Sequence, residues 1–106
     1  MKKDNIILNF KKNILPRIIK EYNPKEVIIF GSRIKGTSTL NSDLDVIIVS
    51  KSFQDTPFIE RMPLLLKKFD FPRHLDYICY TPEEFERMKD TSSLIIDALE
   101  YGETIS

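Results

Sequence analysis

The feature that most constrains this chain is the apolar run at residues 46–49, which begins directly after two aspartates, Asp43 and Asp45. Four β-branched residues in succession predict a strand buried on both faces. Residues two apart on a strand point to the same face, about 6.6 Å apart along the chain. The two carboxylates therefore share one small space, where they repel each other unless protons or cations intervene. This placement predicts a metal site.

Strands and helices alternate along the chain, which predicts an α/β sheet. Besides the strand at 44–49, β-branched and aromatic runs predict strands at 27–30 and 74–80. Apolar spacing and capping residues predict helices at residues 5–22, 57–69, from 82 onward, and 94–101. Pro16 either kinks the first helix or begins a second one, and Pro63 is expected to interrupt the helix at 57–69.

The composition bounds the class of protein. The 106 residues suffice for one domain, 1–106, and are too few for two. A formal net charge of zero argues against general nucleic-acid binding. The single cysteine, Cys79, excludes an internal disulfide and suits a reducing cytoplasm. No apolar stretch is long enough to span a membrane, so we expect a cytoplasmic protein that does not bind membranes.

Charge is distributed unevenly along the chain. Residues 82–106 are mostly acidic, whereas the first half is basic. Ordinary solvated helix faces are one explanation. The alternative is that Arg33 and Lys35 flank an anionic ligand while the acidic tail meets a partner.

A third carboxylate, Asp76, lies in the apolar run at 74–80 and shares a strand face with Ile78 and Tyr80. If this strand adjoins the strand at 44–49, Asp76 joins Asp43 and Asp45 around one site. Carboxylates without a nearby histidine favour Mg²⁺ or Mn²⁺ over zinc. Three carboxylates can hold two such cations, an arrangement that activates an attacking oxygen and stabilises a leaving phosphate. His74 is expected to be a surface residue rather than a ligand.

The turn after the first strand adds a phosphate-binding feature. Gly31 lets the backbone approach a ligand closely, and Ser32 offers a hydroxyl and a helix-start amide to a phosphate oxygen. Arg33 follows directly and is a candidate for neutralising triphosphate charge. A P-loop is excluded, because Thr37 stands where that motif requires lysine.

These motifs together resemble a known family. The stretch "VIIFGSRIKGTSTLNSDLDVIIV", extended by Asp76 in "LDYICYTPEEF", is similar to the signature of the DNA polymerase β-like nucleotidyltransferase superfamily, and most of all to its minimal nucleotidyltransferases (MNT). The resemblance implies a mixed sheet with flanking helices. It also implies that Gly31 and Ser32 bind the nucleoside triphosphate and that Asp43 and Asp45 bind two Mg²⁺ ions. Asp76 is then expected to bind the ion that activates the acceptor and to act as, or assist, the catalytic base.

The resemblance further implies an activity and a partner. Minimal members are often encoded beside a helical HEPN protein, and some act as antitoxins by transferring AMP from ATP to a tyrosine of that toxin. We therefore expect AMP transfer to a hydroxyl of a partner protein. The alternative is a docking module of the same fold that neutralises a partner without catalysis. Retention of all three aspartates favours the enzyme, and self-association of the chain stays open.

Overall fold

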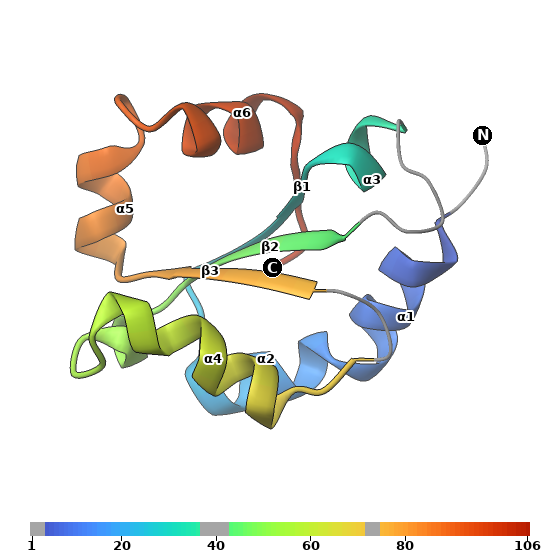
Figure 1. Ribbon diagram of the computed structural model, residues 1–106, viewed down its shortest axis with the longest axis horizontal. Helices are drawn as coiled ribbons and strands as arrows, with labels where there is room; N and C mark the ends of the chain where they lie inside the picture. Colours follow the sequence, from blue (N-terminus) through green and yellow to red (C-terminus); the bar gives the residue numbers. More distant parts are fainter. Residues whose placement is uncertain (1–3, 37–42, 72–74) are drawn as a thin grey trace.

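The computed structural model describes residues 4–36, 43–71 and 75–106, and these residues form one layered unit around a four-stranded sheet (Figure 1). The strand order is β3-β2-β1-β4. Strand β2 runs antiparallel to β1 and parallel to β3, and β4 is antiparallel to β1. The sheet is therefore mixed, as expected. The strands are β1 (Glu26–Phe30), β2 (Leu44–Val49), β3 (Leu75–Tyr80) and β4 (Glu103–Thr104).

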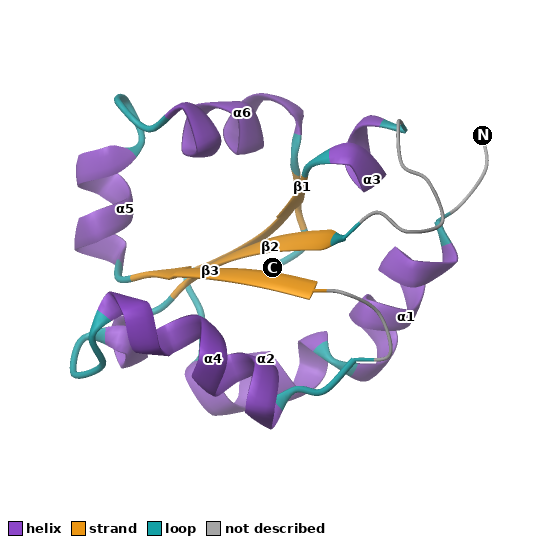
Figure 2. Cartoon of the chain, viewed as in Figure 1, coloured by secondary structure: helices purple, strands orange, loops and turns teal. Residues whose placement is uncertain are grey.

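Helices cover both faces of the sheet (Figure 2). One face packs against α1 (Asn5–Asn13), α2 (Leu15–Tyr22) and α4 (Phe58–Lys68), and the other against α5 (Pro82–Met88) and α6 (Ser93–Tyr101). The short helix α3 (Ser32–Lys35) follows β1, and a 3₁₀ turn (Lys51–Phe53) follows β2. Among the described helices, none is long and apolar enough to cross a membrane.

Strand β2 is buried on both faces, as its sequence predicts. Val46 and Ile48 belong to the larger apolar cluster, under α1, α2 and α4. Ile47 and Val49 belong to the smaller cluster, under α5 and α6. This alternation makes β2 the central element of the core.

The two internal prolines behave differently from each other. Pro16 lies in the first turn of α2, so the chain restarts a helix there, which is the second of the two expected alternatives. The expected interruption at Pro63 is wrong, because α4 runs through it. A proline removes only one backbone bond, here the one to the Ile59 carbonyl, and Ile59 is highly exposed, so that carbonyl can be hydrated.

The C-terminal third contains one helix start that the sequence predicted and one strand that it did not. Thr81 and Glu84 form the expected capping box at the start of α5. The added element is β4, whose neighbour Ile105 donates its N–H to the Val27 carbonyl at 2.8 Å. Strand β4 has only two residues and both are exposed, so it has no alternating apolar pattern from which it could be predicted.

Ion pairs within the chain account for part of the uneven charge distribution along the sequence. Lys35 pairs with Asp97 at 2.8 Å, and Lys11 pairs with Glu103 at 3.0 Å. Basic side chains of the first half thus contact acidic side chains of the tail. These pairs are substantially solvent-exposed, so each contributes little to stability.

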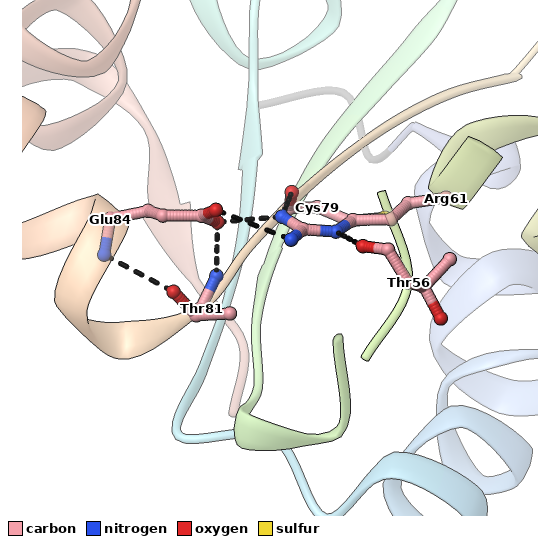
Figure 3. A network of polar contacts seen from close by, with 5 residues as sticks. All are labelled: Thr56, Arg61, Cys79, Thr81 and Glu84. Carbon is pink, nitrogen blue, oxygen red and sulfur yellow. Dashed lines mark hydrogen bonds and ion pairs between the residues drawn. The ribbon is translucent and has the colours of Figure 1, made fainter. Parts of the chain in front are cut away.

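Arg61 connects α4 to the far end of β3 (Figure 3). Its guanidinium is bidentate to Glu84, at 2.6 and 3.2 Å, and also donates to the backbone carbonyls of Thr56 (2.8 Å) and Cys79 (3.1 Å). The residue is only 4% exposed. Hydrogen bonding to Arg61 lowers the pKa of Glu84, which keeps this carboxylate ionised. The network therefore fixes α4, β3 and α5 to one another.

Arg61→Ala is expected to lower the free energy of unfolding by about 2–4 kcal/mol, because it leaves two backbone carbonyls without their donor and the Glu84 carboxylate with only the Thr81 N–H. Lys11→Ala, which breaks the exposed pair with Glu103, is the control and should cost less than about 1 kcal/mol. Urea unfolding of the three proteins at pH 7 measures both. Equal losses would mean that the Arg61 network is not a structural anchor.

Candidate active site

The residues singled out in the sequence gather at one end of the sheet, where β1 ends and β2 and β3 begin (Figure 1). Asp45 lies opposite Asp76 on β3 and opposite Phe30 on β1. Neighbouring strands are about 4.8 Å apart, and register partners point to the same face. The side chains of Asp45 and Asp76 are therefore neighbours on the sheet face that α5 and α6 cover farther along.

The two strand aspartates are partly buried, and Asp43, just before β2, is exposed. Burial, followed by the charges of Asp76 and Asp43, raises the pKa of Asp45 from 3.8 to about 6. The three carboxylates thus act on one another electrostatically. A carboxyl group whose pKa is raised in this way by burial and by neighbouring carboxylates is a candidate for a functional site.

Gly31 brings the turn after β1 against Asp45. Its φ of +86° lies in the left-handed region that favours glycine. A Cβ at this position would collide with Oδ2 of Asp45. The backbone of the predicted phosphate-binding turn is therefore directly beside the carboxylates, and only glycine leaves the space that this approach needs.

The other two predicted nucleotide-binding residues follow in α3. Ser32 is the first residue of this helix, and its side chain lies outside the described part of the structure. Arg33 forms an ion pair with Asp4 at 3.1 Å, and its side chain is only 6% exposed. Because Asp4 also caps α1, accepting the N–H of Ile6 at 2.9 Å, this pair ties α3 to α1 beside the site. Nucleotide binding by Arg33 stays a prediction.

Asp4 is the residue near the site that sequence reasoning missed. The signal was present, since an aspartate directly before an apolar helical pattern is a preferred helix cap. Its pairing with Arg33, 29 positions later, could not be inferred from that signal.

The donor set fits a hard divalent cation. All three candidate ligands carry carboxylate oxygens, which Mg²⁺ and Mn²⁺ prefer. Within residues 4–36, 43–71 and 75–106, no three histidine, cysteine, aspartate or glutamate side chains are already gathered into a metal-binding group. His74 lies outside the described residues. Metal binding by Asp43, Asp45 and Asp76 therefore stays a prediction, supported by their chemistry and the raised pKa of Asp45.

Three further residues of β3 are structural, as their sequence context predicts. Tyr77 and Tyr80 are buried, one in each apolar cluster. Cys79 is buried as well, and burial raises the pKa of its thiol to about 12. A thiol that stays protonated at neutral pH is a poor nucleophile.

A mixed sheet with a glycine turn set against strand aspartates defines a nucleotidyltransferase fold, as the sequence resemblance implied. The nucleotidyltransferase domain family matches residues 11–105, so the chain belongs to this family. The chain is accordingly a nucleotidyltransferase.

Two relatives sharpen this assignment. A Haemophilus influenzae protein named "Probable protein adenylyltransferase MntA" is 32% identical over 79 residues, which cover 73% of this chain and 67% of the relative. The crystal structure of a "putative nucleotidyltransferase" from Sulfolobus solfataricus matches with a TM-score of 0.59 and 28% identity, over 84% of this chain and 85% of that one. The expected relationship to the minimal nucleotidyltransferases is therefore confirmed.

The contact between Gly31 and Asp45 can be tested against a second glycine. Gly36 also has a positive φ, +77°, but a Cβ there would meet no atom within 4 Å. Gly36→Ala should therefore cost about 1–2 kcal/mol of unfolding free energy, from the backbone alone. Gly31→Ala should cost more, by about 1–3 kcal/mol, because it also displaces Asp45. Urea unfolding measures both, and equal losses would show that Asp45 yields without strain.

The raised pKa of Asp45 predicts a pH-dependent effect of Asp45→Asn. A carboxyl whose folded pKa exceeds its unfolded value contributes stability below the unfolded pKa, and this contribution is lost as pH rises through about 6. The variant should therefore melt several degrees above the wild type at pH 7.5 in chelator, and the difference should vanish near pH 4. Thermal unfolding at the two pH values checks this. A variant that is less stable at pH 7.5 would mark Asp45 as favourably paired.

Proposed function

We propose that this nucleotidyltransferase transfers AMP from ATP to a hydroxyl of a partner protein, with a tyrosine as the acceptor. The observation that carries the proposal is the register of β2 and β3, which sets Asp45 opposite Asp76 with Gly31 against Asp45. This arrangement sets the carboxylates beside the predicted phosphate-binding turn. The acceptor class is supported by the relative from Haemophilus influenzae, whose name is that of a protein adenylyltransferase.

In the proposed reaction, the acceptor oxygen forms a bond to the α-phosphorus of ATP. The bond from that phosphorus to the bridging oxygen of the β-phosphate breaks, and pyrophosphate leaves with the bonding electron pair. Asp76 accepts the proton of the hydroxyl. The turn at Gly31 and Ser32 binds the departing phosphates through backbone amides. Positioning and charge complementarity supply the rate enhancement, so no nucleophilic cysteine or histidine is required.

Three carboxylates beside a triphosphate require positive charge. Asp43 and Asp45 would hold two Mg²⁺ ions, or Mn²⁺, and Asp76 would share the ion next to the acceptor. When bound, these cations neutralise the triphosphate and make the acceptor hydroxyl more acidic. The raised pKa of Asp45 supports this assignment, because beyond burial it reflects the charges of Asp76 and Asp43, and a cation would offset the same repulsion.

The partner follows from the family resemblance. A small helical HEPN-type protein encoded beside this chain would be the acceptor, and AMP transfer to its tyrosine would make this chain its antitoxin. In such a pair the reaction takes place in the cytoplasm. The domain that we assign to residues 1–106 would supply the nucleotide site, and the partner would supply the hydroxyl.

Incubation with α-labelled ATP, Mg²⁺ and the HEPN-type protein encoded beside this chain tests the proposal. We expect label on a tyrosine of the partner, located by mass spectrometry, and a loss of at least a hundredfold in Asp45→Asn and Asp76→Asn. Asp90→Asn is the matched control, since Asp90 is exposed between α5 and α6, and it should label normally.

Calorimetry measures whether ATP binding depends on the metal ion. ATP should bind to the wild type with Mg²⁺ and at least tenfold more weakly with chelator, because the carboxylates and the triphosphate repel each other. Equal affinity in both conditions would contradict the metal assignment. Tight binding of the partner without any labelling would instead support the docking-module alternative.

A further inference from the structure

The turn that is proposed to bind the triphosphate is followed by a helix too short to hold its own position. Helix α3 has four residues, and the N–H groups of Ile34 and Lys35 donate to the Gly31 carbonyl at 3.2 and 3.1 Å. A single helical turn is unfavourable in isolation, because several residues are ordered for few hydrogen bonds. The direction in which the Gly31 turn faces the site therefore depends on what α3 contacts.

Apolar and polar contacts hold α3. Ile34 packs against the larger apolar cluster, and Lys35 pairs with Asp97. Arg33 pairs with Asp4 at 3.1 Å, and its side chain is only 6% exposed, against 39% for Lys35. An ion pair that is shielded from water is screened less than an exposed one. Of these two ion pairs, the one with Asp4 therefore constrains α3 more strongly.

Asp4 divides its carboxylate between two helices. Its Oδ1 accepts the N–H groups of Ile6 and Ile7 at 2.9 and 3.3 Å, which caps α1. Its Oδ2 accepts from Nη1 of Arg33 at 3.1 Å, and this nitrogen lies 3.5 Å from Oδ1. A carboxylate can serve both helices at once because both of its oxygens are acceptors. One residue thus fixes α3 to the start of α1.

This geometry bears on what Arg33 does beside a triphosphate. A guanidinium that is nearly buried and already pairs with a carboxylate has little charge left to offer to a phosphate. To bind the triphosphate directly, Arg33 would have to give up Asp4, whose carboxylate would then repel the incoming phosphates. Held by Asp4, Arg33 instead fixes the two residues directly before it, Gly31 and Ser32.

We propose that Asp4 and Arg33 are positioning residues for nucleotide binding, whose ion pair holds α3 so that the Gly31 turn faces the phosphates, and that Arg33 does not itself bind them. The inference rests on the proposed function, because it describes how the phosphate-binding turn of that reaction is kept in place. The position matters because the turn approaches Asp45 so closely that a Cβ on Gly31 would collide with it.

Asp4→Asn separates the two tasks of Asp4. Asparagine caps helices as well as aspartate does, but it has one acceptor oxygen instead of two. The variant should keep α1 capped and lose the bond from Arg33. The two roles of Arg33 then predict opposite changes in the affinity for ATP with Mg²⁺, measured by calorimetry. A positioning pair predicts an affinity at least fivefold weaker, whereas a phosphate ligand released from Asp4 predicts a stronger one.

Asp97→Asn is the matched control. It removes the same charge from the exposed ion pair of α3 with Lys35, and it should not weaken ATP binding. Arg33→Ala should weaken binding at least fivefold, and the double variant with Asp4→Asn should bind no more weakly than Arg33→Ala alone, because Asp4 acts on the nucleotide through Arg33. Additive losses would mean that the two residues act separately, which overturns the inference.

Amide hydrogen exchange by NMR tests the same pair without nucleotide. In Asp4→Asn, the N–H groups of Ile34 and Lys35 should exchange at least fivefold faster, because α3 loses its hold on α1. The N–H groups of Ile6 and Ile7 should keep their protection, since asparagine still caps α1. A role of Asp4 as a helix cap alone would leave the exchange in α3 unchanged.

The outcomes separate the positioning pair from the reaction. Tighter ATP binding by Asp4→Asn, or unchanged exchange in α3, overturns the inference and leaves the reaction standing. Weaker ATP binding by Asp4→Asn, in a protein whose wild type binds ATP but labels no partner, supports the inference and overturns AMP transfer. A wild type that does not bind ATP with Mg²⁺ overturns both.

Discussion

The in-register parallel pairing of β2 with β3 is the constraint on which the rest of the structure depends. It sets Asp45 opposite Asp76, and it also sends Val46 and Ile48 into one apolar cluster and Ile47 and Val49 into the other. A slip of β3 by one residue would turn Asp76 toward the larger cluster, where an unpaired carboxylate is very costly. The apolar residues therefore fix the register, and the register builds the site.

The clustered carboxylates of the site repel one another, and contacts elsewhere in the fold must offset this unfavourable energy. Burial and two neighbouring carboxylates act against ionised Asp45, as its raised pKa shows. The glycine turn adds no side chain that could relieve this, because Gly31 has none. At the opposite end of β3, buried Arg61 joins α4 to α5 through a bidentate pair with the partly exposed Glu84. A strand anchored firmly at one end can carry an electrostatically strained site at the other.

Sequence patterns predicted the elements whose signals are local. The bounds of β2, the capping box of Thr81 and the shared face of Asp76 and Ile78 all follow from period and capping rules. Other features depend on tertiary partners and left no local signal. Arg61 looked like one more charged residue on α4, although it is the most connected side chain in Figure 3. The passage of α4 through Pro63 depends on the exposure of Ile59, which only the folded arrangement determines.

The same distinction applies to the site and to the two edges of the sheet. Alternation along each strand predicted that Asp45 and Asp76 share a space if the two strands adjoin, and the pairing of β2 with β3 meets that condition. The pairing of Arg33 with Asp4, in contrast, required the packing of α3 against α1. One edge of the sheet is closed by β4 and the pairing of Ile105 with Val27. The edge at β3 is covered by α4, and Tyr77 and Cys79 on this edge are only 1% and 2% exposed. An unprotected edge invites non-specific pairing, and charges or coverings usually guard it. Here α4 is the covering, and the bond from Arg61 to the Cys79 carbonyl fixes this helix to the strand, so the outer strand beside the site stays buried without a charged residue of its own on the edge.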